Sequence, residues 1–140
     1  MNLKSIFTTF LLLTFAWTTS LAQSAIGVWK TIDDETGEEM SHVEIFERDG
    51  KVYGKIVKLL TQETTTCDDC SGDRKGKPLV GMEIMWNMKK SGKTWKSGKI
   101  FSPSKDKTYS CKIWLDDANT LKVRGYVAMF YRTQTWYRVK

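Results

Sequence analysis

The sequence predicts an all-β protein in which residues 23–140 form one eight-stranded, antiparallel, up-and-down β-barrel. Short segments in which apolar and polar residues alternate follow one another through this range, and turn-forming residues separate them. No amphipathic stretch of helical length lies between the segments, which excludes parallel βαβ units because these need a helical crossover. A chain of 140 residues is one domain, and its sheet is expected to close because open edges invite aggregation.

Residues 1–22 are predicted to be a secretory signal peptide. Lys4 gives the positive start, residues 6–17 form the apolar segment, and Ser20 and Ala22 place small residues before a cleavage point at Gln23. The apolar segment is too short to be a membrane anchor, because a spanning helix takes about 20 residues. We therefore expect a periplasmic or secreted protein with no membrane span in the mature chain.

The first three strands are predicted from β-branched, aromatic and alternating residues. Residues 26–32 contain Val, Trp, Thr and two Ile, and they end at a polar turn. Val43 and Ile45 alternate with polar neighbours up to Asp49-Gly50, and residues 52–60 carry the next apolar run. An Asp-Gly pair between two such segments is the strongest short-range signal for a β-hairpin.

The remaining strands follow one long irregular stretch, residues 61–78, which is rich in Thr, Asp, Gly and Lys. A strand is expected next because apolar side chains occupy every second position, at Val80, Met82, Ile84, Trp86 and Met88. Further strand-like segments occur at 94–101, 109–115, 121–127 and 130–139. Their short connections favour the up-and-down barrel.

The three cysteines, Cys67, Cys70 and Cys111, are predicted to supply a structural disulfide, as is usual in an exported protein. The sequence leaves the pairing open between Cys67–Cys70 and a link from either of these to Cys111, with one thiol left over. A thiol-active enzyme centred on Cys67 and Cys70 is a weaker alternative. The pair lacks a thioredoxin-like βαβ context, and the two aspartates between the cysteines raise a thiol pKa.

Catalytic, metal-binding and cofactor-binding patterns are missing from the sequence. The single histidine, His42, lies among alternating strand residues and is interpreted as a surface imidazole, while Asp33, Asp34 and Glu35 are explained by a solvated turn. A structural zinc takes four Cys or His ligands, which the chain does not supply as a recognisable set. No nucleophile elbow, phosphate-binding loop or dinucleotide fingerprint occurs. We therefore expect a protein that is not an enzyme and uses no cofactor or metal.

The C-terminal segment carries the strongest candidate for a binding site. Strand alternation places Arg132, Gln134, Trp136 and Arg138 on one face and Tyr131, Thr133, Thr135 and Tyr137 on the other. Inward Arg and Gln side chains are typical of the polar end of a ligand cavity. A closing network with Trp29 near the barrel mouth is the more usual explanation, because buried polar groups usually hydrogen-bond within the fold. The residues predicted to contact a small amphipathic or hydrophobic ligand in the lumen are Trp86, Arg124, Tyr126, Arg132, Gln134 and Trp136.

The formal net charge of +6 raises the question of an anionic partner. Lysines are scattered over most strands and turns rather than clustered in a stripe, and an exported protein does not meet cellular nucleic acid, so nucleic acid is not expected. An alternative function is therefore a cell-envelope interaction module that binds anionic polymers through its basic outer surface and the 61–78 loop.

The sequence also resembles a family of exported bacterial proteins, domain of unknown function 2147. The resemblance covers residues 26–140 and is carried by the runs Gly27-Val28-Trp29, Tyr53-Gly54-Lys55-Ile56, Cys67-Asp68-Asp69-Cys70, Lys77-Pro78-Leu79-Val80-Gly81, Gly98-Lys99-Ile100, Tyr109-Ser110-Cys111, Leu121-Lys122-Val123-Arg124-Gly125-Tyr126 and Arg132-Thr133-Gln134-Thr135-Trp136. It implies a calycin-like barrel, as in lipocalins, and no known reaction.

In calycins a Gly-x-Trp begins the first strand, and a late cation packs over the tryptophan. Gly27 and Trp29 match the first part of this pattern, and Arg132 or Arg138 is the candidate cation. The resemblance therefore implies that Gly27 and Trp29, with Arg138 or Arg132 as the cation, close the barrel rather than bind a ligand.

Overall fold

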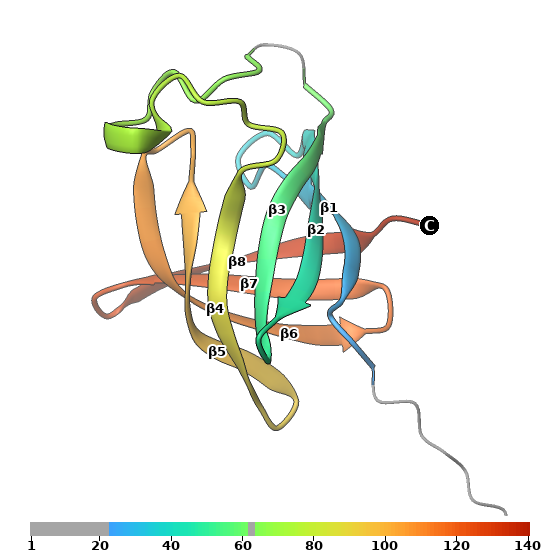
Figure 1. Ribbon diagram of the computed structural model, residues 1–140. Helices are drawn as coiled ribbons and strands as arrows, with labels where there is room; N and C mark the ends of the chain where they lie inside the picture. Colours follow the sequence, from blue (N-terminus) through green and yellow to red (C-terminus); the bar gives the residue numbers. More distant parts are fainter. Residues whose placement is uncertain (1–22, 62–63) are drawn as a thin grey trace, which may run out of the picture.

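The computed structural model describes residues 23–61 and 64–140, and these form one closed antiparallel barrel of eight strands (Figure 1). Each strand pairs with the next along the chain, and the last strand pairs with the first. The predicted all-β, up-and-down barrel is therefore confirmed, while the expected signal peptide lies outside the described residues. The strands are β1 (Gly27–Ile32), β2 (Glu39–Arg48), β3 (Lys51–Leu59), β4 (Glu83–Ser91), β5 (Thr94–Ser102), β6 (Lys107–Asp117), β7 (Thr120–Val127) and β8 (Phe130–Arg138).

The hairpin between β2 and β3 turns at the Asp-Gly pair that the sequence singled out. Asp49 and Gly50 have φ values of 53° and 74°. Two successive positive φ values match the right-handed twist of the flanking strands, and Asp-Gly adopts them readily. Arg48 and Lys51 therefore face one another directly across the turn.

Up-and-down topology gives the barrel two distinct ends. One end holds the turns 33–38, 103–106 and 128–129 and the described residues of the long loop, 60–61 and 64–82, and we call it the open end. The other end holds the three short turns that join β2 to β3, β4 to β5 and β6 to β7, and we call it the closed end.

The seam between β1 and β8 has fewer register pairs than any other two neighbouring strands of the described barrel. It contains the register pairs Trp29–Arg138 and Lys30–Tyr137, whereas β7 and β8 pair over eight positions. Both seam pairs lie toward the closed end, where β1 begins and β8 ends. Toward the open end, β1 and β8 therefore separate.

Large side chains fill the middle of the barrel. The largest fully buried ones are Trp29, Trp136, Ile45, Met85, Met88, Ile113, Leu121 and Val43. An eight-stranded barrel has room for little more than its own inward side chains or one small ligand. Packed apolar side chains thus occupy the space in which a deeply held ligand would lie.

The strand expected from alternation at residues 80–88 is present only in part. It begins at Glu83, and Val80 lies in the preceding loop and is exposed. Asn87 has a φ of 58°, and the pairing of β3 with β4 shifts register twice. Such irregularities interrupt the alternation of inward and outward side chains. Met85 and Met88 are therefore both in the core, although strict alternation would place residues three positions apart on opposite faces.

The long loop packs against the outside of the barrel near the open end. It contains a short 3₁₀ turn, η1 (Gly72–Arg74), and a disulfide between Cys67 and Cys70. Arg74 lies over the Phe101 ring, with its guanidinium carbon 4.1 Å from the ring centre. Of the pairings that the sequence left open, the structure contains the short one, and Cys111 is a buried free thiol.

Candidate functional site

The inward face of β8 is the face that its alternation predicted. Trp136 lies directly opposite Leu121 on β7, and Gln134 lies opposite Val123. Directly opposite residues share one face of an antiparallel pair, and both Leu121 and Val123 belong to the buried core. The inward residues of β8 are therefore Arg132, Gln134, Trp136 and Arg138.

At the closed end, the Arg138 guanidinium covers Trp29. Its central carbon lies 4.3 Å from the centre of the indole ring. The same guanidinium donates hydrogen bonds to the carbonyl oxygens of Ala118 (2.8 Å), Ile26 (3.0 Å) and Ser24 (2.8 Å). These contacts join the chain before β1, the β6–β7 turn and the end of β8, so the arginine ties the closed end together.

Gly27 makes room for this arginine. Its φ is 140°, and a Cβ atom added there would lie 2.6 Å from Nη1 of Arg138. Any side chain at this position would therefore displace the guanidinium. These contacts favour the barrel-closure role predicted for Gly27, Trp29 and Arg138 over a role in ligand binding.

Toward the open end the inner wall is less covered. Ile100, Tyr109 and Gly125 lie together there, because a Cβ added to Gly125 would touch Tyr109 at 3.4 Å and Ile100 at 4.0 Å. All three are only partly buried. Together with two residues of β8 they form what we call the inner-wall patch, which consists of Ile100, Tyr109, Gly125, Arg132 and Gln134.

A polar chain links this patch to the β1–β2 turn. The Trp136 indole N–H donates to the side-chain oxygen of Gln134 at 3.1 Å, and the Gln134 amide donates to the Asp34 carboxylate at 3.2 Å. The neighbouring Glu35 lies 3.9 Å from the Arg132 guanidinium. The turn therefore reaches β8 on the side where β1 and β8 have separated.

The β1–β2 turn is itself ordered by Asp33. The main-chain N–H groups of Thr36 and Glu35 donate to its carboxylate at 2.8 and 2.9 Å. These hydrogen bonds, with that of Thr36 the larger cause, lower the pKa of Asp33 below its ordinary value. The ionised carboxylate thus fixes the shape of the turn that carries Asp34 and Glu35.

Three residues predicted as lumen contacts lie on the outer face. Arg124 and Tyr126 alternate with the buried Val123, and Arg124 stacks on Trp114 and Tyr131 with its central carbon 4.9 and 4.3 Å from their ring centres. The expectation that they face the lumen is wrong, because the apolar side of β7 is the one turned inward.

Trp86 is the third of these residues, and it too lies on the outer face rather than in the lumen, where it was predicted. It pairs with Lys99, while the neighbouring Met85 is fully buried in the core. Its ring lies 5.5 Å from the guanidinium carbon of Arg74, which belongs to the outer loop. The long loop therefore packs on Trp86 and Phe101, on the outer face of the barrel.

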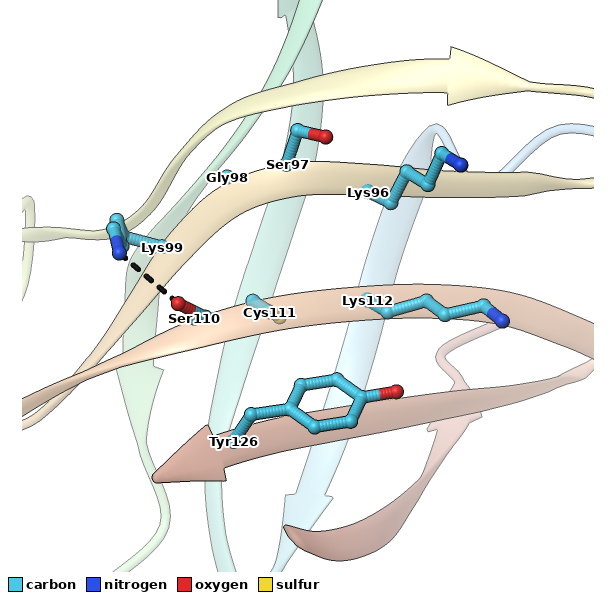
Figure 2. Close-up of a pocket in the computed structure, with 8 residues that line it drawn as sticks. All are labelled: Lys96, Ser97, Gly98, Lys99, Ser110, Cys111, Lys112 and Tyr126. Carbon is cyan, nitrogen blue, oxygen red and sulfur yellow. Dashed lines mark hydrogen bonds between the residues drawn. The ribbon is translucent and has the colours of Figure 1, made fainter. Parts of the chain in front are cut away.

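The outer wall also carries a shallow, open depression of about 360 Å³ between β5 and β6. The strands are spread there because their pairing skips from Trp95 to Gly98, and Ser97 has a φ of 64°. Figure 2 shows the residues that line it, which are Lys96, Ser97, Gly98, Lys99, Ser110, Cys111, Lys112 and Tyr126. No carboxylate is among them, and Lys99 donates a hydrogen bond to the Ser110 hydroxyl at 3.0 Å.

The remaining chemistry of the described chain is sparse. Burial raises the pKa of the Cys111 thiol to about 12, so it is not a nucleophile near neutral pH. Within residues 23–61 and 64–140, no group of three or more His, Cys, Asp or Glu side chains is arranged to hold a metal ion. The same residues form no helix that is long and apolar enough to cross a membrane.

Of the ligand contacts predicted from the sequence, Arg132, Gln134 and Trp136 lie on the inner wall, and the prediction did not include the residues beside them. Tyr109 and Gly125 alternate with core residues, so a signal for them existed in the pattern. Asp34 meets Gln134 across 100 positions of the chain, and no local pattern announces such a contact. The three lysines around the depression gave no signal either, because a bulge in β5 brings them together.

The sequence and the fold of the chain are similar to those of known proteins. No curated protein sequence matches the chain. In three dimensions it is similar to protein HP1028 from Helicobacter pylori, which is described as belonging to the lipocalin family, with a TM-score of 0.74, 19% sequence identity and 84% of each chain covered. Residues 27–138 match the family described as uncharacterized proteins conserved in bacteria (DUF2147). The chain is therefore a lipocalin-like barrel and belongs to the DUF2147 family.

Proposed function

We propose that the protein is an exported, non-catalytic binding protein that takes a small amphipathic molecule at the open end of its barrel. The contrast between the two ends of the inner wall carries this proposal. Trp29 and Trp136 are almost fully buried toward the closed end, whereas Ile100 and Tyr109 remain partly exposed toward the open end. An incompletely covered inner wall with a few convergent polar groups is the usual form of a small-molecule site.

The inner-wall patch offers separate partners for the two halves of such a molecule. Ile100 and Tyr109 present apolar surface, and Gln134 presents an amide that is already held by Trp136. The Arg132 side chain is 60% exposed, and its contact with Glu35 is long at 3.9 Å. Since an exposed ion pair of this kind contributes little, the guanidinium is free to pair with an anionic head group.

A fluorescent fatty-acid analogue, 11-(dansylamino)undecanoic acid, tests the proposal. Its chain matches the apolar side of the patch and its carboxylate matches Arg132. We expect saturable binding that raises dansyl emission. Gly125→Leu places a bulky side chain against Tyr109 and is expected to weaken binding by about tenfold, which is the effect of about 1.4 kcal/mol.

Two further variants keep this test decisive. Arg132→Glu reverses the charge at an exposed position and should weaken the probe comparably even if Gly125→Leu folds poorly. Tyr126→Ala removes an aromatic ring from the outer face of the same strand as Gly125 and should leave binding unchanged. Wild-type affinity in both Gly125→Leu and Arg132→Glu would refute the proposed site.

A second candidate function is attachment to an acidic envelope polymer through the depression in Figure 2. Lys96, Lys99 and Lys112 surround it, and none of them lies within 4 Å of a carboxylate of the described residues. Unpaired cations around a carboxylate-free hollow favour an anionic ligand.

Chromatography on immobilised heparin, used as an acidic glycan, tests this second candidate. Replacing Lys96, Lys99 and Lys112 by Gln should lower the salt concentration at elution. Replacing the exposed Lys58, Lys77 and Lys93 by Gln removes the same charge elsewhere and is the matched control. Equal shifts in the two triple variants would show a general charge effect and exclude a site at the depression.

Export itself remains a prediction from residues 1–22. The mass of the protein recovered from the periplasm or the medium of a bacterial host tests it. We expect a chain that begins at Gln23, and a full-length chain that stays in the cytoplasm would refute export.

A further inference from the structure

The tip of the β7–β8 hairpin is the most apolar exposed segment of the described chain. Val127 is 53% exposed, Met129 86%, Phe130 74% and Tyr131 61%. These four are neighbours in a stretch of five residues that also includes Ala128. In Figure 1 the hairpin extends to the left edge of the molecule, away from the C-terminus. Solvent exposure of so much contiguous apolar surface is typical of an interaction site.

The residues behind the tip follow a definite order along the hairpin. Val127 and Phe130 face one another across the strands, and the next register pair is Tyr126 with Tyr131, whose ring centres are 6.0 Å apart. Behind the two tyrosines come the arginines, since Gly125 pairs with Arg132 and Arg124 pairs with Thr133. Moving away from the tip, the hairpin is thus apolar, then aromatic, then cationic.

Arg124 holds the aromatic layer in place while remaining available to an anion. Its Nε atom donates to the Thr133 hydroxyl at 2.8 Å, and its central carbon lies 4.3 Å from the centre of the Tyr131 ring. It lies within 4 Å of no carboxylate of the described residues. No acidic residue occurs anywhere between Ala118 and Lys140.

We propose that this hairpin docks the protein on a lipid bilayer that contains anionic lipids. The side chains of Met129 and Phe130 would enter the boundary between head groups and acyl chains, as in interfacial anchors. Tyr126 and Tyr131 would lie at the level of the head groups, where aromatic residues with a polar tip are favoured. Arg124 and Arg132 lie one or two residues, or about 3.3 to 7 Å, farther from the tip along each strand than the two tyrosines. They would then face the lipid phosphates.

The charge of the hairpin favours a bilayer over a second copy of the chain. A second copy of this hairpin would offer Arg124 and Arg132 no complementary charge, because no acidic residue occurs between Ala118 and Lys140. An interface between two such hairpins would therefore lack the charge complementarity that stabilises specific contacts. An anionic lipid surface supplies the complementary charge and the apolar layer together.

Co-sedimentation with lipid vesicles tests the proposal. We expect the protein to bind vesicles of phosphatidylcholine with about 30% phosphatidylglycerol, and to bind pure phosphatidylcholine more weakly. Met129→Ser/Phe130→Ser should reduce binding to the anionic vesicles by about tenfold or more, because it removes most of the inserted apolar area. Ile26→Ser/Val80→Ser changes two other exposed apolar residues and should bind as the wild type does.

A second measurement reports insertion directly. In Phe130→Trp, the added indole should shift its emission to shorter wavelength when anionic vesicles are added, relative to the same titration of the wild type. Wild-type protein that binds neither kind of vesicle, or a Met129→Ser/Phe130→Ser variant that binds as the wild type does, would overturn the proposal. A wild-type dimer that dissociates in this variant would also overturn it, since the tip would then be an interface between copies.

This inference does not rest on the proposed ligand site. Met129→Ser/Phe130→Ser leaves the five residues of the inner-wall patch in place, so it should bind the dansyl fatty acid as the wild type does. Failure of the vesicle experiment and failure of the probe experiment are therefore separate results.

Discussion

Arg138 stacks on Trp29 across the seam of the barrel, with the guanidinium carbon 4.3 Å from the centre of the indole ring. The two residues are also a register pair of β8 and β1. One side chain thus covers the buried tryptophan and donates to three carbonyl oxygens of segments that lie far apart in the chain. The guanidinium presents its N–H groups in a planar fork, so these hydrogen bonds depend on its shape as well as on its charge.

Arg138→Ala is therefore expected to lower the free energy of unfolding by about 2 to 4 kcal/mol, because charged hydrogen bonds and the cation–π contact are lost. Arg138→Lys keeps the charge but not the fork, and should lose about half as much. Urea denaturation measures both values. Arg132→Ala on the same face of the same strand is the control and should cost less than about 0.5 kcal/mol, and an equal loss would contradict the closure role.

Gly27→Ala is expected to destabilise the barrel by about 2 kcal/mol or more, since it combines an unfavourable φ with a clash against Arg138. Gly50→Ala is the matched control, because its φ is also positive but nothing lies within 4 Å of the added Cβ. Its cost should be about 1 kcal/mol. In an Arg138→Ala background the cost of Gly27→Ala should fall, and strict additivity of the two changes would show that the glycine does not act through the arginine.

Cys111 is expected to resist thiol reagents in the folded protein. Burial raises the pKa of this thiol to about 12, and the thiolate is the reactive form. Titration with a chromogenic disulfide should detect no thiol in the native protein at neutral pH, one thiol after unfolding, and three after unfolding and reduction. More than one thiol in the unfolded, unreduced protein would contradict the Cys67–Cys70 disulfide.

Acid is expected to loosen the β1–β2 turn. The folded pKa of Asp33 lies below its ordinary value of 3.8, so this carboxylate stabilises the fold above that pH and ceases to do so as the pH falls through the folded value. The amide resonance of Thr36 should therefore titrate with a midpoint below 3.8 in NMR spectra. Asp33→Asn keeps an acceptor oxygen without the charge and should abolish this titration, and a midpoint above 3.8 in the wild type would contradict the assignment.

The regular strands were predictable from the sequence. Along β8 the period of two holds from Arg132 to Arg138, so the inward face was correctly inferred before the position of any neighbour was known. On β7 the same period separates Val123 from Arg124, and the burial of Val123 decides which side faces the core. The lumen placement of Arg124 and Tyr126 failed because it gave more weight to their chemistry than to this alternation.

The irregular parts were not predictable for a physical reason. The positive φ values at Asn87 and Ser97 mark bulges in β4 and β5 that shift every later side chain to the other face. Trp86 was misplaced by the first bulge, and the lysines around the depression are gathered by the second. Contacts such as Gln134–Asp34 depend on how the whole ring closes, which no short window of sequence contains.

The seam between β1 and β8 has a consequence for how the chain folds. The residues that Arg138 joins to the end of β8 include Ile26, 112 positions earlier in the chain. Closing so long a loop is entropically costly and is compensated only when the contacts around Trp29 form. Seven strands without the eighth would leave both β1 and β7 as bare edges, each a template for pairing with another molecule. Folding is thus expected to complete in a late and cooperative step, and nascent or truncated chains are the species most at risk of aggregation.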